Sequence, residues 1–556
     1  MNINLPVGRS GFADIRKNGY YYIDKSGLIR ELLRTDAVQV TLITRPRRFG
    51  KTLGMSMLSE FFDMNKSSRE LFEGLSILSD PQICDRWMNQ YPTVCLSFQS
   101  VDGMNFEEAY DMLRAEIARA CKSHLYLLES TKINPFDKDI FARVAGKQAS
   151  KEEVKNALTG LTQMLSAHFH KPAVLLIDEY DVPLAKAAEK GYYDRMLDVM
   201  KGVLHVIKDN SSLKFAVISG CLRIAKESIF TGTNNLVSDT ISDTRLNAYF
   251  GFTQAETDQI LRDSGLQDHA AEIRTWYDGY RFGDFEIYCP WDVLNHVKNL
   301  QLNPQAQPQS YWKNSSDNAI IRSFMEDYSG TAVTKKFEAL LAGESVIQKI
   351  EDDLTYDSLH VCEDHLWSVL YLTGYLTRVR KNTLQQSLPA GCMELTIPNE
   401  EIREIFEGSV RKWFQDSMQN CDRKALFAAV WNGDEQKAAE ELTKLLRRTI
   451  SYHDYREDFY HAFFAGIFAG AGYLVESNHE HGEGRSDILI QDDAGDRVAV
   501  FEVKYSKTLA ALEGDCVKAL AQIDSRMYAE EWKEEYAQVI CYGIAFYKKR
   551  CLLKKK

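Results

Sequence analysis

A basic turn that contains a glycine, near residue 45, has the residue types that bind phosphate. An apolar run, Val38 to Ile43, leads into Arg45-Pro-Arg-Arg-Phe-Gly-Lys-Thr52, and a helical pattern begins at Leu53. Gly50 lets the backbone approach a phosphate, Lys51 can reach the β- and γ-phosphates of a nucleotide, and the Thr52 hydroxyl can bind Mg²⁺. Arg48 is expected to contact the same phosphates. The turn is therefore predicted to bind ATP.

This turn differs from the usual phosphate-binding loop in two ways. Arg45 stands where that loop has its first glycine, and Pro46 removes one backbone N–H donor. The alternative interpretation is an ordinary turn at the start of a helix. A second motif is needed to decide between the two.

That second motif is a pair of carboxylates at the end of another apolar run. Ala173 to Ile177 is followed by Asp178-Glu179, which is the Walker B pattern. Asp178 is expected to hold the Mg²⁺ shell, and Glu179 to orient or deprotonate the attacking water. An acidic turn after a strand is the alternative. The two motifs lie about 130 residues apart, within one domain and in the right order, and this favours a nucleotide site.

A third apolar run, Phe215 to Ile218, ends in Ser219-Gly-Cys-Leu-Arg223. A polar residue at the end of this strand would lie beside the γ-phosphate, which is the role predicted for Ser219. Arg223 could contact phosphate or a neighbouring subunit. The alternative is a strand-to-loop turn with a surface arginine.

The C-terminal hundred residues contain a second set of chemical groups. Asp487 begins a short apolar run, and an acidic turn joins that run to Val498-Ala-Val-Phe-Glu-Val-Lys504. Alternate residues of a strand share a face, so Glu502 and Lys504 point the same way, and a hairpin would bring Asp487 to them. Two carboxylates and the Val503 carbonyl would suit Mg²⁺ or Mn²⁺. This is the Asp…Glu-x-Lys arrangement of the PD-(D/E)XK nucleases.

Helices are predicted on both sides of this hairpin. Glu457 opens the helical stretch before it, and Gln522 lies on the helix after it, so both could add to the metal site. Lys504 could position a water or stabilise charge on phosphate. The alternative is a surface hairpin with a cross-strand Glu and Lys pair.

The elements that position the first site alternate between strands and helices. Val38–Ile43, Thr93–Phe98, Ala173–Ile177 and Phe215–Ile218 are the strand candidates. Such alternation predicts an α/β fold, in which helices cover both faces of a parallel sheet. We expect a P-loop NTPase core in residues 1–250.

The rest of the chain is divided by composition. Residues 251–300, with the aromatic segment Trp276–Gly283, are expected to form a small lid. Residues 301–310 are polar with two prolines and read as a linker, so residues 301–450 are assigned as a helical connector. Residues 451–556 are predicted to be the α/β nuclease-like domain.

The composition of the chain argues against several classes of protein, among them membrane-spanning and secreted proteins. The chain has 556 residues, a hydrophobic fraction of 45% and a charged fraction of 26%, as in soluble globular proteins. No apolar segment approaches the ~20 residues of a membrane span. The N-terminus lacks a secretory signal pattern, and 11 cysteines without a Cys-x-x-Cys pair indicate a reducing cytoplasm. The net charge is −12, and the basic tail Lys548–Lys556 is expected to be a disordered end.

Together these motifs resemble one family. The chain resembles the uncharacterised bacterial proteins that join an N-terminal AAA-ATPase-like domain to a C-terminal PD-(D/E)XK nuclease-superfamily domain. The resemblance implies ATP binding and a nuclease-type fold, and it accounts for Arg45, because this family carries Arg-Pro-Arg-Arg-Phe-Gly-Lys in the loop. The segments that carry it are Phe12–Ser26, Arg45–Thr52, Leu176–Asp181, Ser228–Phe230 with Asn234–Leu236, Trp276–Gly283, Tyr311–Asn314, Trp367–Leu376 and Glu457–Gln522.

Three functional hypotheses follow, of which the third is a scaffold protein with degenerate sites in both domains. In the first, ATP hydrolysis gates a metal-dependent nuclease that acts on nucleic acid, with DNA favoured. In the second, the chain is an ATP-dependent switch whose nuclease-like domain binds nucleic acid or protein without cutting. The expected cofactors are ATP and Mg²⁺, with Mn²⁺ as an alternative at the nuclease-like site, and assembly into a homo-oligomer is left open.

Overall fold

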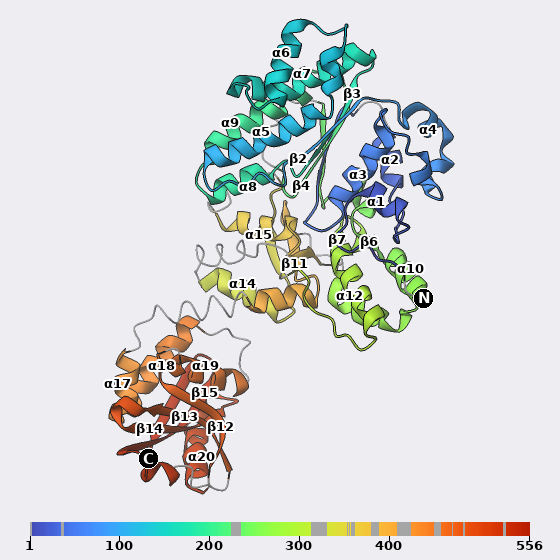
Figure 1. Cartoon of the computed structure of the whole chain (residues 1–556). Coiled ribbons are helices and arrows are strands. Elements are labelled where there is room, and N and C mark those ends of the chain that lie inside the picture. The colour runs from blue at the N-terminus through green and yellow to red at the C-terminus, as the bar shows by residue number, and fades with distance from the viewer. Residues whose placement is uncertain are drawn as a thin grey trace. The chain divides into compact units, whose positions relative to one another are not determined.

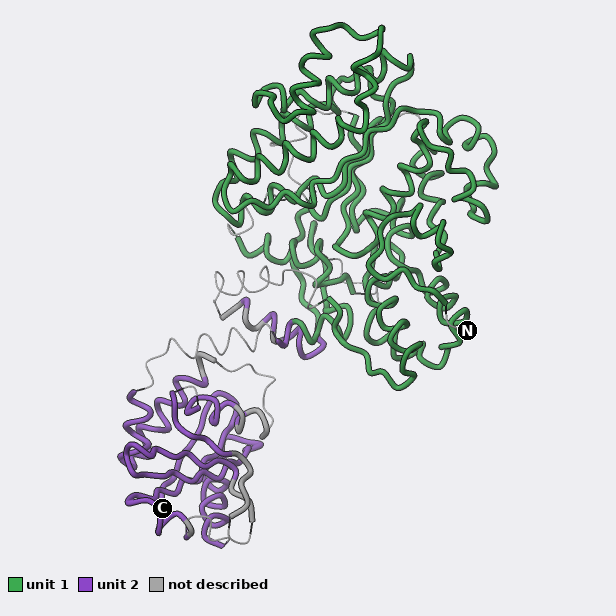
Figure 2. The backbone as a smooth tube through the Cα atoms, in the orientation of Figure 1, with its two compact units in different colours: residues 1–324, 345–405 green, residues 325–344, 406–556 purple. Residues whose placement is uncertain are grey.

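The structure is a computed structural model in which two compact units are distinguished. It describes residues 3–34, 38–223, 235–312, 331–352, 354, 356, 362–379, 388–408, 424–449, 457–469, 471–481, 484–525 and 530–556. Unit 1 comprises Met1–Phe324 and Ser345–Ile405, and unit 2 comprises Met325–Glu344 and Phe406–Lys556 (Figure 2). Among the described helices, none combines the length and the apolarity that a membrane crossing requires.

A parallel sheet forms the centre of unit 1. Within the described residues its five strands lie in the order β2-β3-β4-β1-β5, and every neighbouring pair is parallel. The strands are β1 (Val40–Thr44), β2 (Thr93–Ser97), β3 (Ala173–Asp178), β4 (Leu213–Gly220) and β5 (Leu236–Asp239). The predicted parallel sheet is confirmed, and β5 is a strand that the sequence analysis did not predict.

Helices cover both faces of this sheet (Figure 1). Alternate strand residues face opposite ways, so Leu175 packs with the helices of one face and Leu176 with those of the other. On the first face lie α5 (Phe106–Lys122), α6 (Pro135–Ala145), α7 (Lys151–Phe169), α8 (Val182–Glu189) and α9 (Tyr193–Leu204). On the second lie α1 (Phe12–Lys17), α2 (Gly27–Leu32), α3 (Lys51–Phe62) and α4 (Pro81–Trp87).

A smaller subregion follows the sheet in the chain, where the lid is expected. A capping box between Thr253 and Glu256 starts its first helix. The elements are β6 (Phe252–Thr253), α10 (Gln254–Ser264), α11 (Ala270–Tyr277), β7 (Tyr280–Phe282), β8 (Phe285–Tyr288) and α12 (Pro290–Leu302), with the strands in the order β6-β8-β7.

The middle of the chain contains helices and also a small antiparallel sheet that the sequence analysis did not predict. Its described strands lie in the order β10-β11-β9, with the bounds β9 (Val346–Lys349), β10 (Thr377–Arg378) and β11 (Cys392–Thr396). The helices are α14 (Thr331–Leu341), which belongs to unit 2, and α15 (Glu363–Leu372), which belongs to unit 1. A further helical segment covers residues 400–408.

Unit 2 is built on a mixed sheet with the order β12-β13-β14-β15-β16. The pair β14 and β15 is parallel and joined by α20, and the other pairs are antiparallel. The elements are α17 (Lys424–Asn432), α18 (Glu435–Thr449), α19 (Glu457–Ala469), β12 (Leu474–His481), β13 (Gly484–Asp492), β14 (Arg497–Tyr505), α20 (Leu512–Ser525), β15 (Gln538–Tyr547) and β16 (Arg550–Lys555).

The basic C-terminal tail is ordered, so the expectation of a disordered end is wrong. It forms the edge strand β16, because Cys551 and Leu553 are apolar at alternate positions and enter the core beneath α18 and α19. The backbone N–H of Cys551 donates to Thr443 Oγ1, and that of Lys555 donates to Glu435. Side chains of α18 thus accept hydrogen bonds from backbone N–H groups at the edge of the sheet.

Candidate functional site

The predicted phosphate loop joins β1 to α3 and ends in a left-handed glycine. Gly50 has φ +88° and precedes Lys51, the first residue of α3. The helix therefore starts two residues before the predicted Leu53. The free N–H groups of its first turn and its dipole favour an anion at this end.

Arg45 is a structural clamp, which explains why it can replace the usual glycine. Its side chain is fully buried, and its guanidinium donates to Asp239 Oδ1 at 2.5 Å and to the Asp239 carbonyl at 2.8 Å. It also lies over the ring of Phe250, 5.2 Å from the centroid. Arg45 thus fastens the loop to β5.

The aromatic segment at residues 276–283 supports the loop from the other side. Phe49 is fully buried between Tyr280 and Phe282, with ring centroids 5.0 Å apart in each pair. The Phe49 carbonyl accepts a hydrogen bond from the Gly251 N–H at 3.0 Å. The position of the loop is therefore set by packing against β7 as well as by β1.

Lys51 is buried among oxygen atoms. Its ammonium donates to the carbonyls of Arg45 at 3.0 Å and Pro46 at 3.2 Å, and lies 3.6 Å from Glu179. Burial alone would lower the pKa of Lys51, but the nearby groups Cys221, Glu179, Asp181 and Asp178 raise it. The lysine is therefore a fixed positive charge in the site.

Asp178 ends β3 next to the start of α3. It is buried, and its Oδ1 accepts a hydrogen bond from the Ser219 hydroxyl. Burial raises the pKa of Asp178, while Ser219 and Thr52 lower it. Oδ2 is buried without a hydrogen-bond partner among the described residues. An orphaned carboxylate oxygen beside a threonine hydroxyl could hold a divalent cation.

Glu179 adopts a backbone conformation that is unusual for its residue type. Its φ is +52°, in the left-handed region that costs a non-glycine residue on the order of 1 kcal/mol or more. Strain of this kind is found at active sites, where the surroundings hold it. The conformation directs the Glu179 carboxylate toward Lys51.

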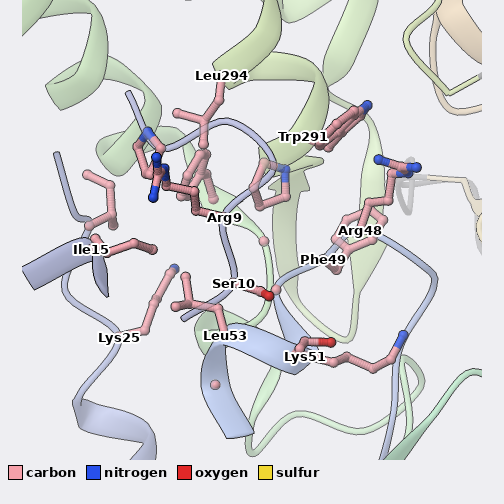
Figure 3. Close-up of a pocket in the computed structure, with 18 of the residues that line it drawn as sticks. Arg9, Ser10, Ile15, Lys25, Arg48, Phe49, Lys51, Leu53, Trp291 and Leu294 are labelled. Carbon is pink, nitrogen blue, oxygen red and sulfur yellow. The ribbon is translucent and has the colours of Figure 1, made fainter. Parts of the chain in front are cut away.

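The remaining two predicted residues of the first site lie at its edges. Arg48 has φ +72°, and its guanidinium lies over the ring of Trp291, 4.0 Å from the centroid (Figure 3). Arg223 is partly buried after β4, and its carbonyl accepts a hydrogen bond from the Leu354 N–H at 3.4 Å. The resemblance segments Ser228–Phe230 and Asn234, and the residues Lys313 and Asn314, lie outside the described residues.

A pocket adjoins the loop. It has a volume of about 290 Å³ and is lined by Lys51 and Thr52, by the N-terminal segment with Tyr21 and Tyr22, and by Trp291. Figure 3 shows the Lys51 side chain extending from the start of α3 away from Lys25, which lies on the other side of the pocket. The pocket could take a nucleoside next to the phosphate loop.

In unit 2 the predicted hairpin is present and brings the second set of groups together. β13 and β14 are antiparallel, with Ile488 opposite Phe501. Beyond this pair, Asp487 Oδ2 accepts a hydrogen bond from the Val503 N–H at 2.8 Å. The N–H and C=O of one strand residue point to the same side, so the Val503 carbonyl also faces the side of Asp487.

Glu502 is the most buried member of this set. It is fully buried, and burial raises its pKa to about 7. Lys504 Nζ donates to its Oε1 at 2.8 Å, as the shared strand face predicts. Oε2 is buried and has no hydrogen-bond partner in the described part of the chain. This orphaned oxygen, with Asp487 and the Val503 carbonyl, fits a divalent cation.

The two flanking helices lie on opposite faces of the unit 2 sheet. Ile523 of α20 packs with Val498 and Val500, so α20 covers the face that carries Glu502. Gln522 is on this helix and is partly buried. α19 packs on Phe501 and hence on the opposite face, with Glu457 as its first residue. The Glu457 side chain lies outside the described part of the structure.

Two features of the site were missed by sequence reasoning. One is the Arg45–Asp239 clamp, because the two residues are far apart in sequence and β5 is short and half-exposed. The other is Tyr356, whose hydroxyl donates to Asp181 Oδ2 at 2.9 Å. No local sequence pattern marks Asp239 as the partner of Arg45, or Tyr356 as the partner of Asp181.

The fold and the two sites define the class of this protein: a phosphate-loop parallel sheet and a nuclease-type mixed sheet in one chain. Two family models match it. The one described as a predicted AAA-ATPase matches residues 6–230, and the one described as the PD-(D/E)XK nuclease superfamily matches residues 455–556. The chain thus combines an AAA-ATPase-like domain with a PD-(D/E)XK nuclease-superfamily domain, as the resemblance implies.

One curated relative resembles the chain over nearly its whole length. It is an uncharacterized protein in the vnfD 5′ region of Azotobacter chroococcum mcd 1, 25% identical over 558 residues, which cover 98% of this chain and 96% of the relative. The similarity therefore spans both of the regions of this chain that the family models match.

Proposed function

We propose that the N-terminal domain binds and hydrolyses ATP and that its cycle gates a metal-dependent phosphodiesterase in the C-terminal domain. The observation that carries the proposal is that each domain pairs a lysine–glutamate ion pair with a buried carboxylate oxygen that lacks a hydrogen-bond partner among the described residues. These are Lys51–Glu179 with Asp178 Oδ2, and Lys504–Glu502 with Glu502 Oε2. A phosphate and its cation need both kinds of group.

The residues of the ATP site have distinct roles in this proposal. Lys51 moves its hydrogen bonds from the loop carbonyls to the β- and γ-phosphates. Thr52 and Asp178 hold Mg²⁺, which supplies charge neutralisation on the phosphates. Glu179 orients the attacking water, and Ser219 keeps Asp178 in place. Arg48, Gly50 and Arg223 complete the phosphate contacts.

The nuclease-like site works on a phosphodiester. Asp487, Glu502 and the Val503 carbonyl hold the metal ion, which acts as a Lewis acid on the phosphate. Lys504 gives up its ion pair with Glu502 and positions a water or stabilises the charge that develops on phosphate. Gln522 contributes from α20, the helix that covers the face with Glu502. The substrate is nucleic acid, with DNA favoured, and the location is the cytoplasm.

The second candidate is a nucleotide-dependent switch that binds nucleic acid or protein without cutting. One observation favours it: Lys504 already occupies an oxygen of the fully buried Glu502 at 2.8 Å, so a metal ion must compete with that ion pair. A site in which the metal loses this competition would keep the fold and lack the chemistry.

The experiment that separates the candidates is a pair of assays on the purified full chain. ATP hydrolysis is measured with Mg²⁺, and cleavage of plasmid and single-stranded DNA is measured with Mg²⁺ or Mn²⁺. The proposal expects cleavage that Asp487→Ala and Glu502→Ala abolish. ATP turnover without cleavage of either substrate would favour the switch.

A further inference from the structure

A tyrosine from the middle of the chain enters the ATP site. Tyr356 is partly buried against the core of the parallel sheet, and its hydroxyl donates to Asp181 Oδ2 at 2.9 Å. The same oxygen accepts the backbone N–H groups of Cys221 and Leu222, each at 3.0 Å. Three donors thus converge on one buried carboxylate oxygen, two residues after Glu179.

The chain on either side of Tyr356 is held in unit 1. The Leu354 N–H donates to the carbonyl of Arg223, the last described residue after β4. The Glu351 N–H donates to Ser368 Oγ of α15 at 2.9 Å, and Ser242 Oγ donates to Asp352 at 3.4 Å. The hydroxyl of Tyr356 is therefore placed by contacts from α15, from the end of β4 and from the residues after β5.

The same segment also contacts the phosphate loop. Gly374, with φ +88°, lies so close to Pro46 that a Cβ built on it would be 3.2 Å from the proline ring. The Arg281 N–H donates to Thr377 Oγ1 at 2.9 Å. Arg281 lies between Tyr280 and Phe282, the two residues that pack on Phe49 of the loop. The segment thus contacts both the phosphate loop, at Pro46, and the turn after β3, at Asp181.

We propose that the described residues within 345–378 form a reader segment for the nucleotide and that Tyr356 is its positioning residue. The inference rests on the proposed ATPase function. The Tyr356 hydroxyl fixes Asp181, and the short turn from Asp181 back to Glu179 then fixes the strained Glu179 carboxylate. A nucleotide that moves the loop or Glu179 must also shift this segment, which continues along the chain toward Phe406, where unit 2 resumes.

Removing the hydroxyl should affect turnover more than binding. Phenylalanine keeps the ring against the core and leaves Asp181 with two donors, while Asp181 Oδ1 already lacks a hydrogen-bond partner in the described residues. The turn then holds Glu179 less firmly, and a catalytic group displaced by a fraction of an ångström costs about tenfold in rate. The phosphate contacts of Lys51 are unchanged.

The test compares Tyr356→Phe with Tyr192→Phe in the full-length protein. Tyr192 is a matched control, because it is a buried tyrosine of unit 1 outside the reader segment, and its hydroxyl donates to the Gly103 carbonyl at 2.8 Å. We expect Tyr356→Phe to lower kcat for ATP about tenfold with KM within twofold of wild type, and Tyr192→Phe to change neither. Equal kcat values in the two variants would overturn this inference and would leave the proposed ATPase function intact.

Two further outcomes complete the test. Absence of ATP turnover in the wild type would remove the proposed function and the inference with it. Amide hydrogen exchange is then measured in peptides within 362–378, with and without a non-hydrolysable ATP analogue. We expect slower exchange with the analogue in wild type and a smaller change in Tyr356→Phe, and exchange that the analogue leaves unaltered in wild type would rule out a reader segment.

Discussion

Lys51 and Glu179 form an ion pair of 3.6 Å across the proposed phosphate site, between the first residue of α3 and the strained residue after β3. The Lys51 ammonium also donates to two carbonyls of its own loop. In the proposed function, a phosphate that binds here would take the Lys51 ammonium from those oxygens. Its binding would then release the Glu179 carboxylate from the ion pair.

Lys51→Ala should abolish nucleotide binding. Wild type at an ATP concentration of 100 Kd should gain about 2.7 kcal/mol of stability, seen as a higher melting temperature with MgATP. The variant should show no such increase. Lys66→Ala is the control, because Lys66 follows the far end of α3 and pairs with Glu60 at 2.9 Å. A Lys51→Ala protein that MgATP still stabilises as wild type would contradict the assignment.

Glu179→Gln should separate binding from hydrolysis. Glutamine keeps the shape of the side chain but cannot accept a proton from water, so we expect kcat for ATP to fall at least a hundredfold. The MgATP-induced increase in melting temperature should persist. Turnover at the wild-type rate would show that another residue activates the water.

Arg45→Gly would restore the glycine of an ordinary phosphate loop, yet it should destabilise unit 1. The change removes the closer cation of the buried Asp239 and leaves only Arg245, 3.8 Å from Oδ2, so we expect a loss of about 3–5 kcal/mol. The matched control is Arg9→Gly, in an exposed ion pair with Asp14, where the loss of stability should be much smaller. Both are measured by denaturant unfolding. Equal stabilities would show that Arg45 does not clamp the loop to β5.

The contrast between Arg45 and Lys51 shows which features of the site could be predicted from the sequence. Lys51, Asp178 and the Asp487–Glu502–Lys504 hairpin were predictable, because alternating burial and strand ends place side chains by local rules. The partners of Arg45 and Tyr356 were not, because each lies more than 170 residues away. β5 escaped prediction because its exposed Val237 and half-buried flanks give no apolar run.

Glu502 should make the metal-free protein less stable as pH rises. Burial raises the pKa of its folded form to about 7, above the 4.5 of an ordinary glutamate. The stability that its protonated form contributes is complete below about pH 4.5 and is lost as pH rises through about 7.

Glu502→Gln removes this titration. With EDTA present, the variant should match wild type near pH 4.5 and exceed it by up to about 3 kcal/mol at pH 8, measured on the unfolding of unit 2. A variant less stable than wild type at pH 8 would mean that the Glu502–Lys504 ion pair outweighs the cost of burying the carboxylate.

The central claim, that ATP gates cleavage, is tested most directly by the initial rate of plasmid cleavage with Mg²⁺, with and without ATP. Wild type is compared with Lys51→Ala and Glu502→Ala. We predict that ATP changes the wild-type rate, that Lys51→Ala retains cleavage but loses the response to ATP, and that Glu502→Ala does not cleave. Wild-type cleavage at one rate with or without ATP, and equal in Lys51→Ala, would contradict the account.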